Sequence, residues 1–489
     1  MAAHPQILCF SLLLFGAALF VVVAEESFDV RRHLSTVTRY QTAKDISANS
    51  NIVSSVPSQC RPIHLNLVAR HGTRAPTKKK MKDLEALATR LLILTGNVKD
   101  QKSSVFPGWL KGWRSPWTGK YKGGELISEG ETELYELGLR VREKFPELFK
   151  EDYHPDIYPI RATQVARAAV SAVAFGMGLF SGRGNLGPGH HRAFAVTSES
   201  RASDIYLRFH DHCQNYKAFR KSQEPKVLKL KEPVLNEISK ELAQQWSLNF
   251  SRADVSSLWF LCKQEASLLN KTDQACSLFS PSQVALLEWT DDLEVFVLKG
   301  YGNSLNYRMG VPLLNDVILS MEQAIKAKAD GLVPGTYEMA KLRFAHAETL
   351  LPFSCLIGLF LDGSEFEQIR KEEPLQLPPK PPQKRTWYGS TVAPFAGNNM
   401  LVLYSCPENN TNNYYVQVLH NEQPLPMAGC GNSDFCRFEV FKDKIAAPHL
   451  KHDYNALCSP ELITPTGIFS QILRWFFPVD ASSSPKTEL

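Results

Sequence analysis

The sequence lacks the features of a membrane-embedded, fibrous or disordered protein. Of its 489 residues, 44% are hydrophobic and 21% are charged, and no long apolar run occurs after the first 24 positions. This excludes a polytopic membrane protein and a collagen-like or generally disordered chain. We find no internal repeat at solenoid or propeller periods. A Cys-x-x-Cys pair is also absent, which excludes a zinc ribbon. The length suits roughly two to four domains, or one large domain with insertions.

The one long apolar run lies at the extreme N-terminus. Residues 7–23 contain no charged side chain, and Val22 and Ala24 are small residues at positions −3 and −1 of a cleavage site. We predict a signal peptide over residues 1–24, which leaves no stable membrane anchor after cleavage; the alternative is an uncleaved signal anchor.

The other end of the chain also carries a targeting pattern. It finishes in Lys486-Thr487-Glu488-Leu489, which is similar to the Lys-Asp-Glu-Leu retrieval signal and would bind a retrieval receptor. The two ends together predict a protein of the secretory pathway that stays in the lumen of the endoplasmic reticulum. Secretion or a vacuolar destination is the alternative.

The secretory pathway would allow disulfide bonds between the cysteines. Nine cysteines remain after residues 1–24 are removed, so at least one thiol is unpaired or bonds another chain. Cys355 is our candidate for the free thiol, because it lies in the nearly continuous apolar run 350–361. Three sequons predict glycosylated surface loops, at Asn249, Asn270 and Asn409.

The order of the predicted elements favours an α/β protein. Residues 63–69 alternate between the two faces of a strand, and this strand ends at Arg70. A helix is expected from residue 128 onward, where Ser128 and Glu131 have the spacing of a capping box. Further strand patterns occur at 342–346, 400–404 and 414–419.

The stretch between the early and late strands reads as mostly helical. We therefore predict an α/β domain in two sequence pieces, interrupted by a helical domain. The predicted divisions are a first α/β part at 25–181, the helical insertion at 182–330, a second α/β part at 331–478 and a polar tail at 479–489.

The most informative stretch is the heptapeptide Arg70-His71-Gly72-Thr73-Arg74-Ala75-Pro76. It directly follows the first predicted strand, and open α/β sheets bind ligands at the carboxyl ends of their strands. An imidazole between two guanidinium groups suits attack on phosphorus better than binding of a metal cation, because arginines bind phosphoryl oxygens. Gly72 would allow the backbone to turn. The alternative is a strand-end histidine that lies beside surface arginines by chance.

This pattern is similar to the signature of the histidine phosphatase superfamily, and the chain resembles its branch 2, the histidine acid phosphatases. A second motif, His346-Ala347-Glu348-Thr349, resembles the multiple inositol polyphosphate phosphatases, the plant phytase-like members in particular. Acid phosphatases of this branch have His-Asp at that place. The resemblance covers about residues 57–476. It implies a mostly parallel sheet flanked by helices, with an inserted, mostly helical domain.

The resemblance also implies the roles of individual residues. His71 would be the nucleophile that becomes phosphohistidine, and Glu348 the proton donor, without a metal or other cofactor. The phosphate-binding residues would be Arg70, Arg74, Arg161 and His346. Arg161 precedes an expected helix, where a cation is unfavourable unless an anion lies nearby. Four disulfides are implied: Cys60–Cys406, Cys213–Cys458, Cys262–Cys276 and Cys430–Cys436.

The charge distribution favours a small, highly anionic substrate. Residues 61–122 contain 14 Lys and Arg against three Asp and Glu, a local net charge of +11, whereas the whole chain has +5. Directly after the first motif, a basic rim would be formed by Lys78, Lys79 and Lys80. The alternatives are a solvated lysine face or a nucleic-acid patch. We expect no nucleic-acid partner, because the chain has no known nucleic-acid-binding module.

The preferred interpretation is a histidine-dependent phosphomonoesterase that acts on inositol polyphosphates such as phytate. One alternative is a broad-specificity acid phosphatase, or one that takes bisphosphoglycerates. Another is a non-catalytic lumenal protein that binds polyphosphates. The presence of both His71 and Glu348 favours catalysis, because a silent relative would usually have lost one of them.

Overall fold

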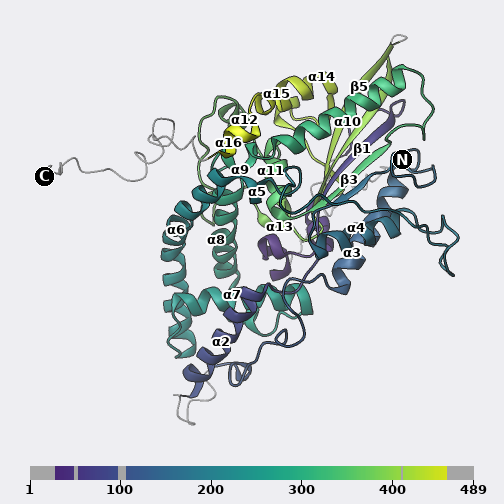
Figure 1. The fold of residues 1–489 in the computed structure, drawn as a ribbon. Helices are drawn as coiled ribbons and strands as arrows, with labels where there is room; N and C mark the ends of the chain where they lie inside the picture. The colour runs from purple at the N-terminus through teal and green to yellow at the C-terminus, as the bar shows by residue number, and fades with distance from the viewer. Residues whose placement is uncertain (1–27, 49–52, 97–105, 409–410, 460–489) are drawn as a thin grey trace, which may run out of the picture.

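The computed structural model describes residues 28–48, 53–96, 106–408 and 411–459 (Figure 1). The predicted signal peptide, the sequon at Asn409 and the tail with its Lys-Thr-Glu-Leu end lie outside these residues. Within the described ranges, no helix is both long and apolar enough to cross a membrane.

A seven-stranded sheet forms the centre of the fold. Its hydrogen-bonded order is β2-β3-β1-β4-β5-β6, and β7 pairs with β5 outside this path. The strands are β1 (Arg61–Arg70), β2 (Ile160–Ala162), β3 (Ala340–Ala345), β4 (Asn398–Glu408), β5 (Thr411–His420), β6 (Gln423–Pro424) and β7 (Phe435–Arg437). The strands predicted from the sequence patterns are present, and the predicted α/β class is confirmed.

The sheet is mixed rather than mostly parallel. β1 and β2 both pair with β3 in parallel, whereas the pairs β1–β4, β4–β5, β5–β6 and β5–β7 are antiparallel. The connection lengths explain the difference. Only residues 409–410 separate β4 from β5, and a connection this short can join only antiparallel neighbours.

Helices cover both faces of the sheet (Figure 1). On one face lie α3 (Ser128–Lys144) and α4 (Ala166–Leu179), and Leu65 and Leu67 of β1 pack into their core. On the other face lie α10 (Val311–Ala329) and α11 (Ala347–Leu356), in the core that contains Val68. β1 is buried on both faces, but only the α3–α4 face is wholly apolar: on the other face His64 and Asn66 are buried, and they hydrogen-bond to Glu338, Ser320 and Arg343.

Helix α3 begins where the sequence predicted, but without the predicted capping box. Ile127 is the N-cap residue, and the Ser128 hydroxyl donates to Glu129 instead. The Ile127 amide donates to the Thr73 carbonyl at 3.2 Å. Contact with the loop after β1 therefore fixes the start of this helix.

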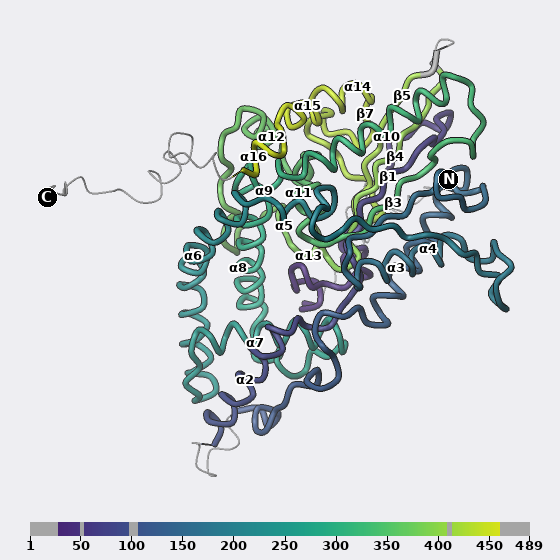
Figure 2. The backbone as a smooth tube through the Cα atoms, in the orientation of Figure 1, coloured from purple at the N-terminus to yellow at the C-terminus, as the bar shows by residue number. Residues whose placement is uncertain are grey.

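The chain between β2 and β3 is mostly helical. After α4 come α5 (Phe209–His212), α6 (Gln214–Trp246), α7 (Arg252–Leu269), α8 (Pro281–Lys299), α9 (Leu305–Arg308) and α10. A separate core joins α6, α7 and α8 to α2 (Lys78–Gly96) and to residues 106–127, which precede the predicted insertion. Figure 2 shows α2 beside α7, away from the sheet. The domain division at 182 and 330 stays a prediction.

Most of the remaining helices are short and lie either before β1 or after α11. At the N-terminal end, the 3₁₀ turns η1 (Val30–His33) and η2 (Ser35–Val37) precede α1 (Tyr40–Ala48). The later elements are α12 (Gly363–Arg370), α13 (Gly389–Val392), α14 (Phe438–Val440), a π-helical turn (Phe441–Ala446), α15 (Ala447–Leu450) and α16 (Tyr454–Cys458). The η2 turn contacts α13, so the N-terminal segment packs beside the chain that leads into β4.

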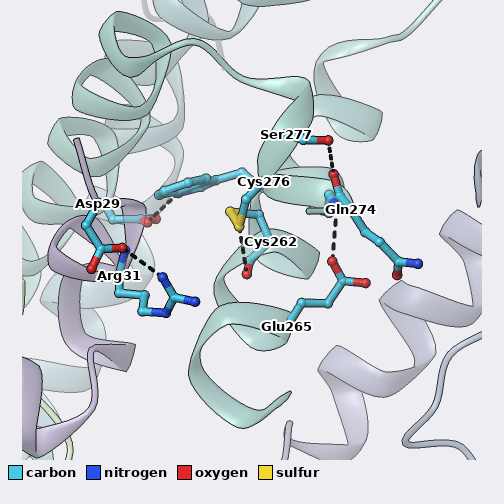
Figure 3. The surroundings of a disulfide bond; sticks show 10 residues. Asp29, Arg31, Cys262, Glu265, Gln274, Cys276 and Ser277 are labelled. Carbon is cyan, nitrogen blue, oxygen red and sulfur yellow. Dashed lines mark hydrogen bonds and ion pairs between the residues drawn. A yellow bond between two sulfur atoms is a disulfide. The ribbon is translucent and has the colours of Figure 1, made fainter. Parts of the chain in front are cut away.

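The structure contains the four disulfides that the resemblance implied. They are Cys60–Cys406, Cys213–Cys458, Cys262–Cys276 and Cys430–Cys436. The first joins the residue before β1 to β4, across 346 positions of sequence. Cys355 has a free, buried thiol, as predicted. In Figure 3, Glu265 lies next to the Cys262–Cys276 bond, and its carboxylate accepts from the Ala275 amide at 3.0 Å. These bonds indicate folding in an oxidising compartment such as the secretory pathway.

Candidate active site

Arg70 and His71 lie at the carboxyl end of β1, in the middle of the sheet. The Arg70 amide donates to the Gly397 carbonyl at 2.8 Å, and the His71 amide donates to the Ala345 carbonyl at 3.1 Å. The His71 carbonyl accepts from the Ala396 amide at 3.0 Å. The chain on either side, β3 and the segment before β4, therefore holds His71 at the edge where the parallel strands end.

Gly72 is required by close packing rather than by its backbone angles. It is not among the glycines with positive φ. A Cβ atom on Gly72 would lie 2.2 Å from the carbonyl oxygen of Gly130, in the first turn of α3. Its amide also donates to Ser171 Oγ of α4 at 3.1 Å. The loop after β1 thus lies directly on both helices, which corrects the expectation of a turn.

A carboxylate of α3 fixes the next residue of the loop. Glu133 accepts from the Thr73 amide at 2.7 Å and from the Thr73 hydroxyl at 2.8 Å. It also accepts from the Tyr40 amide at 3.2 Å. Thr73 lies between His71 and Arg74, so Glu133 orients the two side chains that flank it.

His71 has the protonation state that a nucleophile needs. Its Nδ1 lies 2.9 Å from the Gly72 carbonyl oxygen. Because a carbonyl can only accept, Nδ1 carries the proton and Nε2 keeps its lone pair. Burial, followed by the charge of Arg70, holds the pKa of His71 well below its usual value. The imidazole is therefore neutral at neutral pH.

Arg70 is clamped beside His71 by the segment that precedes β4. Its Nη1 donates to the Ala393 carbonyl at 2.7 Å and also to the Thr36 carbonyl. Its guanidinium lies 4.5 Å from the centre of the Phe395 ring, a cation–π distance. These contacts use one nitrogen and one face of the guanidinium, which leaves the remaining nitrogens for a ligand.

The arginine charges lie close enough to repel one another. Burial, and then the charge of Arg74, lowers the pKa of Arg70 to about 9. Burial, and then the charge of Arg167, lowers the pKa of Arg74 to about 10. Arg70 and Arg74 therefore remain cations at neutral pH. A nearby anion would relieve both the repulsion and the cost of burial.

The structure does not bring Arg161 to this cluster. Its Nη2 donates to Glu199 at 2.6 Å, and its guanidinium lies 5.1 Å from the Tyr206 ring. Arg167 takes the place that the sequence analysis gave to Arg161. The charge of Arg167 contributes to the lowered pKa of His71, and its Nη2 lies 3.4 Å from His346 Nδ1.

Sheet geometry explains this correction. Arg161 is a residue of β2, and a strand side chain points to a face of the sheet. Arg167 is in the first turn of α4, the helix that follows the strand and begins at its carboxyl edge. A cation at a helix N-terminus is unfavourable unless an anion binds nearby. This argument was applied to Arg161, but the residue at the helix N-terminus is Arg167.

His346 presents a second imidazole to the same space. It is the N-cap residue of α11, and its ring centre lies 5.5 Å from that of His71. Arg208 Nη1 donates to His346 Nε2 at 3.0 Å. Arg167 Nη2 lies 3.4 Å from His346 Nδ1, so guanidinium donors face both nitrogens of the ring. A neutral imidazole accepts through only one nitrogen, so one of these guanidinium groups keeps an N–H that an anion can accept.

Glu348 brings a carboxylate to the cluster from the first turn of α11. Its Oε1 accepts from Lys299 Nζ at 2.9 Å, and its side chain is 32% exposed. The charge of Lys299 holds the pKa of Glu348 well below its usual range, against the opposing effect of burial. The charge of Glu348 also acts on Arg70 and Arg167, so it belongs to the same site.

Several arginines of this site keep a donor free. Among the described residues, no hydrogen-bond partner exists for the buried Nε–H groups of Arg70, Arg74, Arg167 and Arg208. An unpaired buried donor costs free energy, and more so when the group is charged. A phosphoryl group accepts several such donors at once. The arrangement therefore suits a phosphate monoester held against a neutral imidazole.

The predicted lysine rim begins at the edge of the site. Three exposed side chains start α2: Lys78, Lys79 and Lys80. Lys78 packs against the turn formed by Gly123 and Gly124. A Cβ atom on Gly124 would lie 3.8 Å from Arg167 Nη1. Lys80 instead pairs with Asp83 at 3.2 Å. The rim therefore stays a prediction, and Lys78 has the strongest support.

Basic side chains from the helical stretch also reach the site, although no sequence pattern predicted them. Arg208 contacts His346, whereas His210, Arg220 and Lys299 interact electrostatically with Glu348. These four residues lie 49 to 140 positions before Glu348 in the sequence. No local motif marks them, and only the tertiary fold brings them to the site.

Comparison with known proteins agrees with this geometry. Residues 63–421 match the histidine phosphatase superfamily (branch 2). The chain is 26% identical to multiple inositol polyphosphate phosphatase 1 of Dictyostelium discoideum, over 82% of this chain and 69% of that protein. It is also 26% identical to a thiamine-repressible acid phosphatase of Schizosaccharomyces pombe, over 83% and 84%.

A solved structure has the same fold. The phytase from D. castellii superposes with a TM-score of 0.66 at 19% identity, over 91% of this chain and 93% of that one. The family match covers most of the chain and includes both sequence motifs. The protein therefore belongs to branch 2 of the histidine phosphatase superfamily.

Proposed function

We propose that this protein hydrolyses inositol polyphosphates, including phytate, through a phosphohistidine at His71. The observation that carries the proposal is the neutral imidazole whose Nε2 keeps its lone pair amid buried arginines with free donors. Protonated histidine could not attack phosphorus, and the arginines would stabilise the charge on the phosphoryl oxygens.

The proposed reaction has two steps. In the first, His71 Nε2 attacks phosphorus, the P–O bond to the leaving group breaks, and Glu348 gives its proton to the departing oxygen. Arg70, Arg74 and Arg167 hold the phosphoryl oxygens. In the second, the Glu348 carboxylate takes a proton from water, and the water oxygen displaces His71 from phosphorus.

The basic surroundings support a substrate with several phosphates. One phosphate accounts for the arginines around His71, whereas Arg208, Arg220, Lys299 and Lys78 provide further positive charge beside them. The relative from Dictyostelium is named for inositol polyphosphates, and the related solved structure is a phytase. The second candidate, a broad acid phosphatase, is favoured by the equal identity to the S. pombe enzyme.

Phosphate release separates the two candidates. We expect the purified protein to release phosphate from inositol hexakisphosphate with a kcat/KM well above that for p-nitrophenyl phosphate. His71→Ala should release none from either. A preference for p-nitrophenyl phosphate would favour the acid phosphatase. Binding of inositol hexakisphosphate without hydrolysis would leave only the non-catalytic alternative.

We further propose that residues 1–24 are cleaved and that the Lys-Thr-Glu-Leu end retains the protein in the endoplasmic reticulum. Asn249 and Asn270 are exposed, which supports their glycosylation. Deleting residues 486–489 should move the protein into the medium of expressing cells. An unchanged cellular fraction would contradict retrieval by this end.

A further inference from the structure

The proposed proton donor is engaged in an ion pair. Lys299, the last residue of α8, donates to Glu348 Oε1 at 2.9 Å. A general acid must hold a proton when the leaving group departs. An ammonium group in direct contact favours the carboxylate instead, so the geometry of the free protein opposes the role that the first step needs.

The other elements around Glu348 do not correct this. The titratable groups that face it come from five elements: Arg70 at the end of β1 and Arg74 after it, Arg167 of α4, His210 of α5, Tyr216 and Arg220 of α6, and His346 before α11. Every charged member of this group also favours the carboxylate. Burial alone acts in the opposite direction.

We propose that Lys299 is a positioning residue that selects polyphosphorylated substrates, because it releases Glu348 only when a second phosphate group binds its ammonium. The inference rests on the proposed function. In the free enzyme, Lys299 holds Glu348 as a carboxylate. A phosphate next to the one being transferred draws the ammonium away, and its negative charge favours protonation of Glu348.

The position of the pair allows this exchange. The Lys299 side chain is 19% exposed and that of Glu348 is 32% exposed, so solvent and a substrate can reach both. A lysine ammonium on a flexible stem can change partners without moving the backbone. Two partners compete for it, and a phosphate with more than one negative charge attracts it more strongly than one carboxylate.

The proton balance follows from the same exchange. Glu348 takes a proton from solvent and passes it to the leaving oxygen as the P–O bond breaks and the bond from His71 Nε2 to phosphorus forms. Glu348, again a carboxylate, then takes a proton from the water that hydrolyses phosphohistidine. A single-phosphate alkyl ester leaves Lys299 on Glu348, so its alkoxide departs without a proton.

The test is Lys299→Met, assayed on inositol hexakisphosphate and on glycerol 2-phosphate, which has one phosphate and an alkoxide leaving group. The pH dependence of kcat/KM reports groups of the free enzyme. For Lys299→Met with glycerol 2-phosphate, we expect the alkaline limb of the kcat/KM profile to move to higher pH by about one unit or more. The preference for inositol hexakisphosphate should fall by about tenfold or more.

Two further variants make the result specific. Lys299→Arg keeps the cation and should retain the wild-type pH limb and preference. Lys442→Met removes the lysine of another Lys–Glu pair, which joins the π-helical turn to Glu322 of α10 at 3.1 Å, and should change neither the pH limb nor the preference. A purely structural role for Lys299 would not move the pH limb.

An unchanged pH limb with an equal loss on both substrates would overturn the inference. So would a Lys299→Arg variant that behaves like Lys299→Met. Failure of the proposed function has a different outcome: wild-type protein would not release phosphate from inositol hexakisphosphate. The pH limb with glycerol 2-phosphate would still show whether Lys299 controls the protonation of Glu348.

Discussion

Replacing Arg167 by methionine tests the placement of the third phosphate-binding arginine. The Arg167 guanidinium lies 3.4 Å from His346 and lowers the pKa of His71, so it is within reach of a phosphoryl group on His71. Two unit charges 4 Å apart interact with about 4 kcal/mol at an effective dielectric constant of 20. Removing one preorganised donor from an anionic transition state costs about 2.7–4 kcal/mol. We therefore expect kcat/KM to fall about 100- to 1,000-fold.

Arg161→Met is the matched control, because it makes the same change six positions earlier. Arg161 pairs with Glu199, whose side chain is 49% exposed. Surface ion pairs of this kind contribute about 0–1 kcal/mol, so kcat/KM should fall less than about fivefold.

The assay is phosphate release, together with competitive inhibition by inorganic phosphate. Inhibition should weaken in Arg167→Met and persist in Arg161→Met. The reasoning is refuted if Arg161→Met loses as much activity as Arg167→Met. It is also refuted if phosphate inhibits Arg167→Met as strongly as the wild type.

Three further predictions concern the nucleophile and stability. His71→Ala should abolish turnover, and labelled phosphate should be trapped on the wild type in an acid-labile, base-stable form but not on the variant; substantial turnover in the variant would contradict the mechanism. Asp316→Ala should lower the free energy of unfolding by about 3–5 kcal/mol, because Arg343, 1% exposed, loses the carboxylate that pairs with it. Urea unfolding measures this, and a loss below about 1 kcal/mol would show that other contacts hold Arg343. Glu265→Gln should raise the melting temperature at pH 7.5 but not at pH 4, because burial raises the pKa of Glu265 to about 7. The stability from its protonated form is complete below its unfolded pKa and is lost as the pH rises through 7. An equal shift at both pH values would show that ionisation of Glu265 is not the cause.

The element types could be predicted from the sequence because their periodicities are local. β1 alternates between the two faces of the sheet, and the strands at 400–404 and 414–419 were recognised in the same way. The relative direction of these two strands was not predicted. The stretch between the two patterns is polar, so the sequence did not indicate that β4 and β5 extend to within two residues of each other. The short hairpin makes this half of the sheet antiparallel, a property of the connection rather than of either strand.

The site could be predicted only as far as it is contiguous in sequence. Arg70, His71 and Arg74 follow one strand, and His346 and Glu348 follow its parallel neighbour, so strand order alone brings the two motifs together. Arg208 and Lys299 have no comparable signal, since they reach the site through the packing of α5 and α8. Arg161 was expected to bind phosphate because it follows a short apolar segment, but its side chain leaves β2 towards a face of the sheet, and this direction is set by the sheet and not by the local sequence.

The same positive field has opposite effects on the two proposed catalytic groups. Burial, reinforced by this field, keeps His71 neutral, which leaves a lone pair for attack on phosphorus. The field also keeps Glu348 ionised, which suits the activation of water in the second step and opposes proton donation in the first. Removing cations to help the first step would weaken both phosphate binding and the nucleophile. A negatively charged substrate can change the field during the reaction, since it neutralises the cations as it binds. The geometry therefore ties proton donation to the charge of the substrate, and a substrate with several phosphates meets this condition best.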